Sequence, residues 1–195
     1  MNKKAERGHA TRNQLVSLAV RLFAEHGYEG TSVDMVLRES GLSRGALYHH
    51  FAGKEALFAG ALEAVEAQVS EDVAAAARQL DDPRAALRAG CLAWIRLARE
   101  PEVRQIVLVD APSVVGWHRW REIEERYGFG LLKGSLQMVA RSGGLPPELV
   151  DPFAHMLLAA MNEIALVIAN APDGDEAIRQ GEHAVDELLN RLLPG

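Results

Sequence analysis

Polar side chains occur along residues 41–57, GLSRGALYHHFAGKEAL, at a spacing that suits contact with a nucleic acid. On a helix, the apolar Leu47 is expected to supply the buried contact, which leaves Arg44, Tyr48 and His49 outside. Arginine can donate hydrogen bonds to guanine or to phosphate, and tyrosine and histidine can donate to phosphate oxygens. We therefore interpret this side of the segment as a surface that contacts DNA.

Gly45 supports this interpretation, because glycine weakens a helix and needs a reason to lie in its first turn. Without a side chain it allows a partner to approach the backbone closely. The alternative is that Tyr48 packs inside the protein and that His49 and His50 are a solvated pair. A metal site at the two histidines is not expected, since adjacent residues on a helix point about 100° apart.

Three short helices are predicted to position these residues. A capping box at Thr11 precedes an apolar stripe over residues 15–23, which we expect to form the first helix. A second helix is expected over residues 31–39 and a third over 44–51, with a turn at 41–43 between them. The order of helix, three-residue turn and short helix is typical of a helix-turn-helix motif, whose second helix enters the major groove.

The ends of these helices are predicted from residues that can cap them. Thr31 and Ser43 are the expected N-caps, and Gly41 can adopt the positive φ that the turn requires. The third helix has only about two turns, too few to be stable alone. It must therefore pack on its neighbours, through Leu47 and Phe51.

The rest of the chain also has helical periodicity, with apolar residues three and four apart and no convincing period-two run. We predict an all-α protein of about nine helices, with a helix-turn-helix domain over residues 1–55 and a helical domain over 56–195. The later helices are expected at about 54–80, 83–99, 101–110, 114–142, 148–170 and 178–192, with Asp82 as the cap of the helix that begins at Pro83.

The net charge of −6 is distributed unevenly along the 195 residues. Residues 1–55 have 8 Lys and Arg against 6 Asp and Glu, whereas the remainder has 13 against 21. A basic N-terminal segment (residues 1–55, the head) followed by an acidic remainder (the body) agrees with DNA binding by the head. The single cysteine, Cys91, excludes an internal disulfide framework and a multi-cysteine zinc site, and we expect no cofactor. We expect a soluble, cytoplasmic protein without a membrane partner.

Residues 27–57, GYEGTSVDMVLRESGLSRGALYHHFAGKEAL, resemble the DNA-binding signature of the tetracycline-repressor (TetR) family of bacterial transcription regulators. The resemblance covers residues 15–62 closely, and the helical plan fits the remainder. It implies binding to double-stranded operator DNA. Carried onto this sequence, the DNA-binding residues are Thr31, Ser32, Arg44, Gly45, Tyr48, His49 and Lys54.

The resemblance also implies a small-molecule pocket in the body and a homodimer formed by the last two helices. The sequence supports the dimer independently, because the helix expected at 148–170 is apolar on most of its circumference and a striped helix follows at 178–192. Together they offer more apolar surface than one chain easily covers.

The ligand-binding residues are harder to choose. Trp117, Trp120 and Arg121 share a helical face, which favours an aromatic wall with a polar anchor for a small, largely apolar effector. The alternative is core or dimer packing, with Arg121 paired to Glu124 or Glu125. The full set of candidates is Trp94, Trp117, Trp120, Arg121, Met156, Asn162 and Glu163.

The resulting hypothesis is a ligand-responsive transcription regulator, a repressor released from a palindromic operator by its effector. One alternative is a regulator without a small-molecule effector, acting as an activator or through a protein partner. Another is an all-α enzyme that uses the body pocket. It is disfavoured because the sequence has no nucleophile elbow, phosphate-binding loop or metal-spaced motif.

Overall fold

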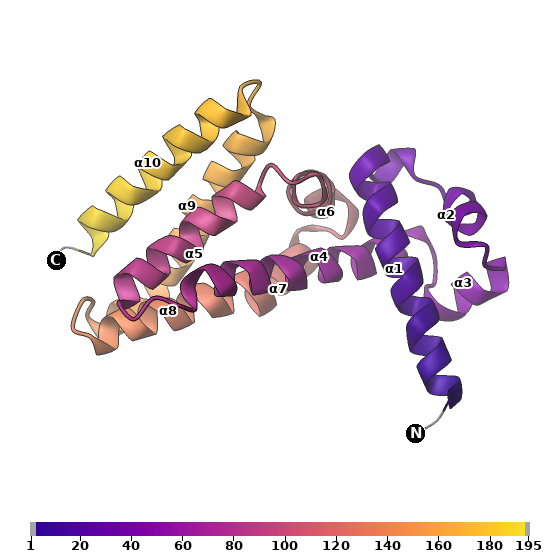
Figure 1. The fold of residues 1–195 in the computed structure, drawn as a ribbon, viewed down its shortest axis with the longest axis horizontal. Coiled ribbons are helices and arrows are strands. Elements are labelled where there is room, and N and C mark those ends of the chain that lie inside the picture. The colour runs from indigo at the N-terminus through magenta and orange to yellow at the C-terminus, as the bar shows by residue number, and fades with distance from the viewer. Residues whose placement is uncertain (1–2, 194–195) are drawn as a thin grey trace. The chain divides into compact units, whose positions relative to one another are not determined.

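The computed structural model describes residues 3–193, and the side chains of residues 8–193. Every regular element in that range is helical (Figure 1), which confirms the all-α prediction. The elements are α1 (Lys3–Gly30), α2 (Val33–Ser40), α3 (Arg44–His50), α4 (Lys54–Ala77), α5 (Pro83–Leu97), the π-helix η1 (Val103–Asp110), α6 (Ala111–Val114), α7 (Trp117–Glu124), the π-helix η2 (Glu125–Phe129), α8 (Gly130–Arg141), the 3-10 turn η3 (Pro147–Leu149), α9 (Val150–Asn170) and α10 (Gly174–Leu192).

The chain folds into two compact units. The first contains residues 1–65 and 101–120, and the second contains residues 66–100 and 121–195. Two of the crossings between the units fall inside continuous helices, α4 and α7. The unit that holds the helix-turn-helix motif therefore includes η1 and α6 as well as the residues predicted for the head.

The first unit is built on α1, which packs against α2 and η1. Its core includes Leu15, Ala19, Leu22, Phe23, Val36, Leu47, Phe51, Leu57 and Phe58, all buried. At Gly27 the chain leaves helical geometry with φ 70°, and the amide of Tyr28 donates to Asp110 Oδ2 at 2.7 Å. This bond joins the end of α1 to the end of η1.

Two predicted caps in the first unit were wrong. Thr11 lies inside α1, which begins at Lys3, so Thr11 cannot cap that helix. Ser32 rather than Thr31 caps α2, because its hydroxyl accepts from the amide of Met35 at 3.1 Å. Thr31 is buried instead, and its hydroxyl is shared between the carbonyls of Leu22 at 3.1 Å and Gly27 at 2.9 Å.

The second unit is a helical bundle in which α5 packs against α8, α9 and α10, and α9 packs against α8 and α10. Figure 1 shows α9 and α10 side by side as an antiparallel pair at the C-terminus. Asp82 caps α5 as predicted from the Asp-Pro sequence, with the amide of Ala85 donating to its carboxylate at 2.9 Å.

The single helix predicted over residues 114–142 is divided in the structure. Gly116, with φ 76°, separates α6 from α7, and η2 separates α7 from α8. A left-handed residue ends a helix, and only glycine adopts it without strain. The periodicity continues through the π-helical turn, which is why the sequence pattern did not reveal the break.

One helical segment of the described chain, residues 147–170, is long and apolar enough to cross a membrane by length and composition. Part of its surface is buried against α5, α8 and α10, as expected for the core helix of a bundle. Length and composition alone are therefore weak evidence for a membrane span.

Candidate functional site

The predicted DNA-contacting surface forms on α3 and the turn before it. Gly41 adopts φ 67° in the turn, and the Ser43 hydroxyl accepts from the amide of Ala46 at 3.2 Å to begin α3. Leu47 is fully buried and anchors the helix, whereas Tyr48 on the neighbouring position is 46% exposed. The burial of Leu47 thus fixes which side of the short helix faces outward.

Arg44, Gly45 and His49 are also exposed on α3. A Cβ added at Gly45 would meet only the Ser43 hydroxyl, at 4.0 Å, so the space beside this backbone is open to a partner. The Arg44 guanidinium donates to the carboxylate of Asp34 on α2. Because this ion pair is exposed, it contributes little stability and can be exchanged for a contact with DNA.

The remaining predicted DNA contacts differ in exposure. Ser32 is exposed at the start of α2, and Lys54 is half-buried with its ammonium 4.0 Å from the centre of the Tyr28 ring. Thr31 is buried, so its side chain is not presented to DNA. Arg12, which was not among the predicted contacts, is an exposed residue of α1, and its guanidinium lies 5.2 Å from the Phe51 ring at the end of α3.

A cavity of about 90 Å³ lies in the second unit. Most of its lining is apolar, and six elements contribute to it. The lining residues are Glu66, Val69, Ser70, Val73, Leu87, Gly90, Cys91, Trp94, Glu124, Gly128, Leu131, Leu132, Ser135, Leu158, Met161 and Asn162. None of them is a lysine, an arginine or a histidine.

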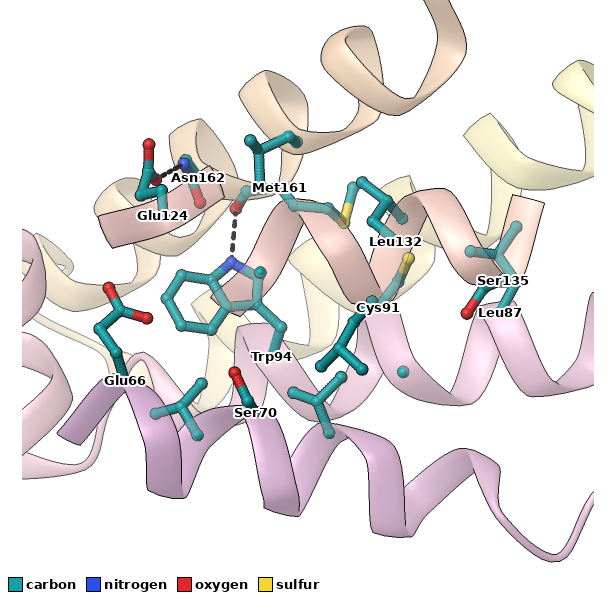
Figure 2. A pocket seen from close by; sticks show the side chains of 16 residues that line it. Glu66, Ser70, Leu87, Cys91, Trp94, Glu124, Leu132, Ser135, Met161 and Asn162 are labelled. Carbon is teal, nitrogen blue, oxygen red and sulfur yellow. Dashed lines mark hydrogen bonds between the residues drawn. The ribbon is translucent and has the colours of Figure 1, made fainter. Parts of the chain in front are cut away.

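Two carboxyl groups from different helices face this cavity. Glu66 on α4 is 5% exposed and Glu124 at the end of α7 is 6% exposed. Figure 2 shows both on the same side of the Trp94 indole. Burial, followed by the negative charge of Glu124, raises the pKa of Glu66 to about 8.

Glu124 is held by two partners, whereas Glu66 is not. Arg121 donates to Glu124 Oε2 at 2.8 Å and the Asn162 amide donates to Oε1. Burial still raises the pKa of Glu124, although the Arg121 charge and the hydrogen bond from Asn162 oppose it. No hydrogen bond or ion pair joins Glu66 to any other described residue.

Trp94 and Cys91 form the wall contributed by α5. The Trp94 indole nitrogen donates to the carbonyl of Met161 at 3.3 Å, which fixes the ring against α9 (Figure 2). Burial raises the pKa of the Cys91 thiol to about 12, so this cysteine is not a nucleophile at neutral pH. Within the described residues, no group of three His, Cys, Asp or Glu could hold a metal ion.

The structure brings only Trp94 and Asn162 of the seven ligand candidates to the cavity. Arg121 reaches it through Glu124, the pairing weighed as the alternative. The predicted aromatic wall does not line this cavity: Trp117 is 61% exposed, Trp120 is buried in the first unit, and their rings lie 5.0 Å apart.

Met156 and Glu163 also lie outside the lining of this cavity. Both are exposed on the face of α9 directed away from the cavity, because the helix turns Met161 and Leu158 inward instead. The sequence held a signal for Glu66 that was overlooked. It lies four residues after Leu62 and three before Val69, in the apolar stripe of α4.

Two family models match the chain. The model described as "Tetracyclin repressor-like, C-terminal domain" matches residues 84–192, more than half of the chain. The model described as "Bacterial regulatory proteins, tetR family" matches residues 15–61. Together they include α2, α3 and most of the cavity.

Similar proteins include curated regulators and solved structures. The HTH-type transcriptional repressor AcnR of Corynebacterium efficiens is 43% identical over 63 residues, which are 32% of this chain and 34% of AcnR. The match thus spans about a third of this curated relative. A TetR-family transcriptional regulator of Pectobacterium atrosepticum is 30% identical over 100% of this chain and 99% of its own, with a TM-score of 0.85. FadR of Bacillus subtilis in complex with stearoyl-CoA is 18% identical, with a TM-score of 0.71 over 93% of this chain and 97% of FadR, a likeness of fold alone.

Proposed function

Since the chain belongs to the TetR family of transcription regulators, we propose that it is a homodimeric repressor that binds a palindromic operator and is released by a small, largely apolar effector. The observation that carries this proposal is the presence, in one chain, of an exposed helix-turn-helix surface and a mostly apolar, partly open cavity. We assign the protein to the cytoplasm, where its DNA would be.

The operator would be contacted by α3 in the major groove. Arg44 and Tyr48 are exposed on α3 while Leu47 is buried, and Gly45 permits close approach of the backbone. Phosphate contacts by Ser32 and Lys54 would set the register of the helix. A two-fold dimer would present two copies of α3 to two half-sites, which is why we expect a palindrome.

The dimer would form through α9 and α10. Met156 and Val167 on α9 are 61% and 58% exposed, and Leu188 on α10 is 38% exposed. Large apolar side chains gathered on two neighbouring helices favour burial against a second copy. Pairing two such helices from each chain would give a four-helix bundle.

Release would depend on α4, which runs from Lys54 in the first unit to the cavity residues Glu66 and Val69 in the second. An effector that displaced the cavity end of α4 would move a helix whose first residue belongs to the DNA-binding surface. It must bind the form that does not fit the operator more tightly than the form that does. FadR, which has the same fold, was solved with stearoyl-CoA, and this supports ligand binding by such a bundle.

The size of the cavity favours a second candidate, a regulator without a small-molecule effector. At about 90 Å³ it is smaller than the roughly 300–1,000 Å³ typical of pockets for drug-sized ligands. Any effector must therefore be small or must widen the cavity. An enzyme has less support, because the matched relatives are regulators and Cys91 is not activated.

The DNA-binding part of the proposal is tested by selecting bound sequences from a random DNA pool. We expect the purified protein to enrich a palindrome, Tyr48→Ala to lose that enrichment, and Arg44→Ala to change the preferred bases. Arg78→Ala, at an exposed arginine of the second unit, is the matched control at constant salt. Enrichment unaffected by the two α3 variants would contradict the assignment of α3.

A further inference from the structure

The Glu66 carboxyl is the one lining group of the cavity that is nine-tenths buried, ionisable at neutral pH and without a hydrogen-bond or ion-pair partner among the described residues. Buried polar groups are almost always hydrogen-bonded, because an unpaired one keeps the full cost of losing its water. Figure 2 shows the carboxyl at the end of the cavity nearest Glu124, apart from any labelled polar side chain that could satisfy it. A molecule that enters the cavity can supply the missing partner.

The charged groups around the cavity determine which net charge a bound ligand can carry. The ionisable groups that line it are Glu66, Glu124 and Cys91, and Cys91 is neutral. Arg121 balances the charge of Glu124, and Glu125 adds a further negative charge nearby. No cation compensates Glu66 when it ionises, so a cationic ligand is favoured. An anionic ligand would add to the negative charge here, and a wholly apolar ligand would leave the carboxyl unsatisfied.

Resting on the proposed function, we propose that the effector is a small organic amine, bound with its ammonium group between Glu66 and Glu124 and its short alkyl or aryl body against Trp94 and Leu132. An ammonium has three donors and can serve both carboxylates. The apolar lining and the small volume suit a body of few carbon atoms.

Binding of an amine in this way would be coupled to the release of a proton. Because burial keeps Glu66 largely protonated at pH 7, binding of R–NH₃⁺ would form a carboxylate–ammonium pair and release the Glu66 proton to solvent. The affinity for the amine should therefore increase with pH, by up to about tenfold per pH unit below pH 8, while the amine itself stays protonated. A neutral alcohol of the same shape would release no proton.

The test is calorimetric titration of the full chain with butyl, hexyl and benzyl compounds, each as amine, alcohol and carboxylate. Titrations in two buffers of different ionisation enthalpy count the protons released. We expect the amines to bind at least tenfold more tightly than the alcohols, with close to one proton released at pH 7, and no binding of the carboxylates. Glu66→Gln should weaken amine binding at least tenfold and abolish proton release.

Glu71→Gln is the matched control, because Glu71 is an exposed glutamate of the same helix outside the cavity. It should bind amines as the unaltered protein does. Thermal melts of both variants establish that they are folded. Alcohols or carboxylates that bind as tightly as amines, amines that bind Glu66→Gln unchanged, or no binding of any amine would each overturn the proposal.

A second measurement separates this proposal from the proposed function. The selected operator DNA is titrated with protein in the presence and absence of the tightest amine. If the amine weakens DNA binding by the unaltered protein and by Glu71→Gln but not by Glu66→Gln, both proposals are supported. DNA binding that no amine changes overturns the amine effector but leaves a palindrome-binding regulator in place. Failure to enrich any operator overturns the repressor, while calorimetry still decides the amine site.

Discussion

Glu66 links the cavity to the pH dependence of stability. Its pKa rises from the usual 4.5 to about 8 in the folded state, so between these values the folded protein holds a proton that the unfolded chain has lost. The contribution of Glu66 to the free energy of unfolding is therefore fully present below about pH 4.5 and is lost as the pH rises through about 8. Glu124, whose pKa is also raised, acts in the same direction.

We expect Glu66→Gln to flatten this dependence, because an amide of the same size has no proton to lose. Between about pH 5 and pH 8, the slope of unfolding free energy against pH should change by up to about 1.4 kcal/mol per pH unit. Urea unfolding of the unaltered protein, Glu66→Gln and Glu71→Gln over this range measures the difference. Parallel curves for all three would contradict the burial of an unpaired carboxyl.

At the scale of single residues, the sequence predicted those helix caps and turn residues that depend only on their neighbours in the chain. Ser43, Asp82 and Gly41 have the roles predicted for them, because a cap or a positive φ depends on residues next to it in the chain. The cavity could not be predicted in this way, because Glu66 on α4 and Glu124 on α7 are far apart in sequence and line the same cavity only in the folded chain. The tryptophans near residue 118 did not indicate where the cavity lies, whereas a single glutamate in the apolar stripe of α4, Glu66, does line it.

Thr31, a predicted DNA contact, is buried at the junction between α1 and α2. The family resemblance implies a DNA contact here, whereas the structure gives the hydroxyl to the carbonyls of Leu22 and Gly27 and leaves 1% of the residue exposed. The hydroxyl thereby joins the end of α1 to the start of α2. The capping role belongs to its exposed neighbour Ser32.

Replacing Thr31 by valine keeps the shape and removes the hydrogen bond. We expect Thr31→Val to destabilise the protein by about 1–2 kcal/mol in urea unfolding. Operator affinity, measured where the variant is fully folded, should stay within about threefold of the unaltered protein, a factor worth less than 1 kcal/mol. Ser32→Ala should instead lose operator affinity, since its side chain faces solvent at the α2 N-terminus. A large loss of affinity in Thr31→Val at unchanged stability would restore Thr31 as a DNA contact.

The whole molecule leaves part of its most apolar helix uncovered. The sequence of α9 is apolar on most of its circumference, and the fold of one chain buries Leu157, Leu158 and Met161 but not Met156 or Val167. The sequence predicted a helix that is apolar on most of its circumference, and a single chain buries only part of that apolar surface. Covering the rest with a second copy is consistent with the homodimer that we propose.

Val167→Glu tests this arrangement, because it would place an unpaired charge inside the proposed α9–α10 interface of the dimer. We expect sedimentation velocity to show a monomer at micromolar concentration. Operator affinity should fall at least a hundredfold, since a monomer contacts one half-site and loses the gain from linking two binding events. Leu80→Glu, at an exposed leucine between α4 and α5, introduces the same charge away from the proposed interface and should remain a dimer with full operator affinity. If Val167→Glu also remains a dimer, the exposed face of α9 does not form the interface, and another surface must bring the two copies of α3 together.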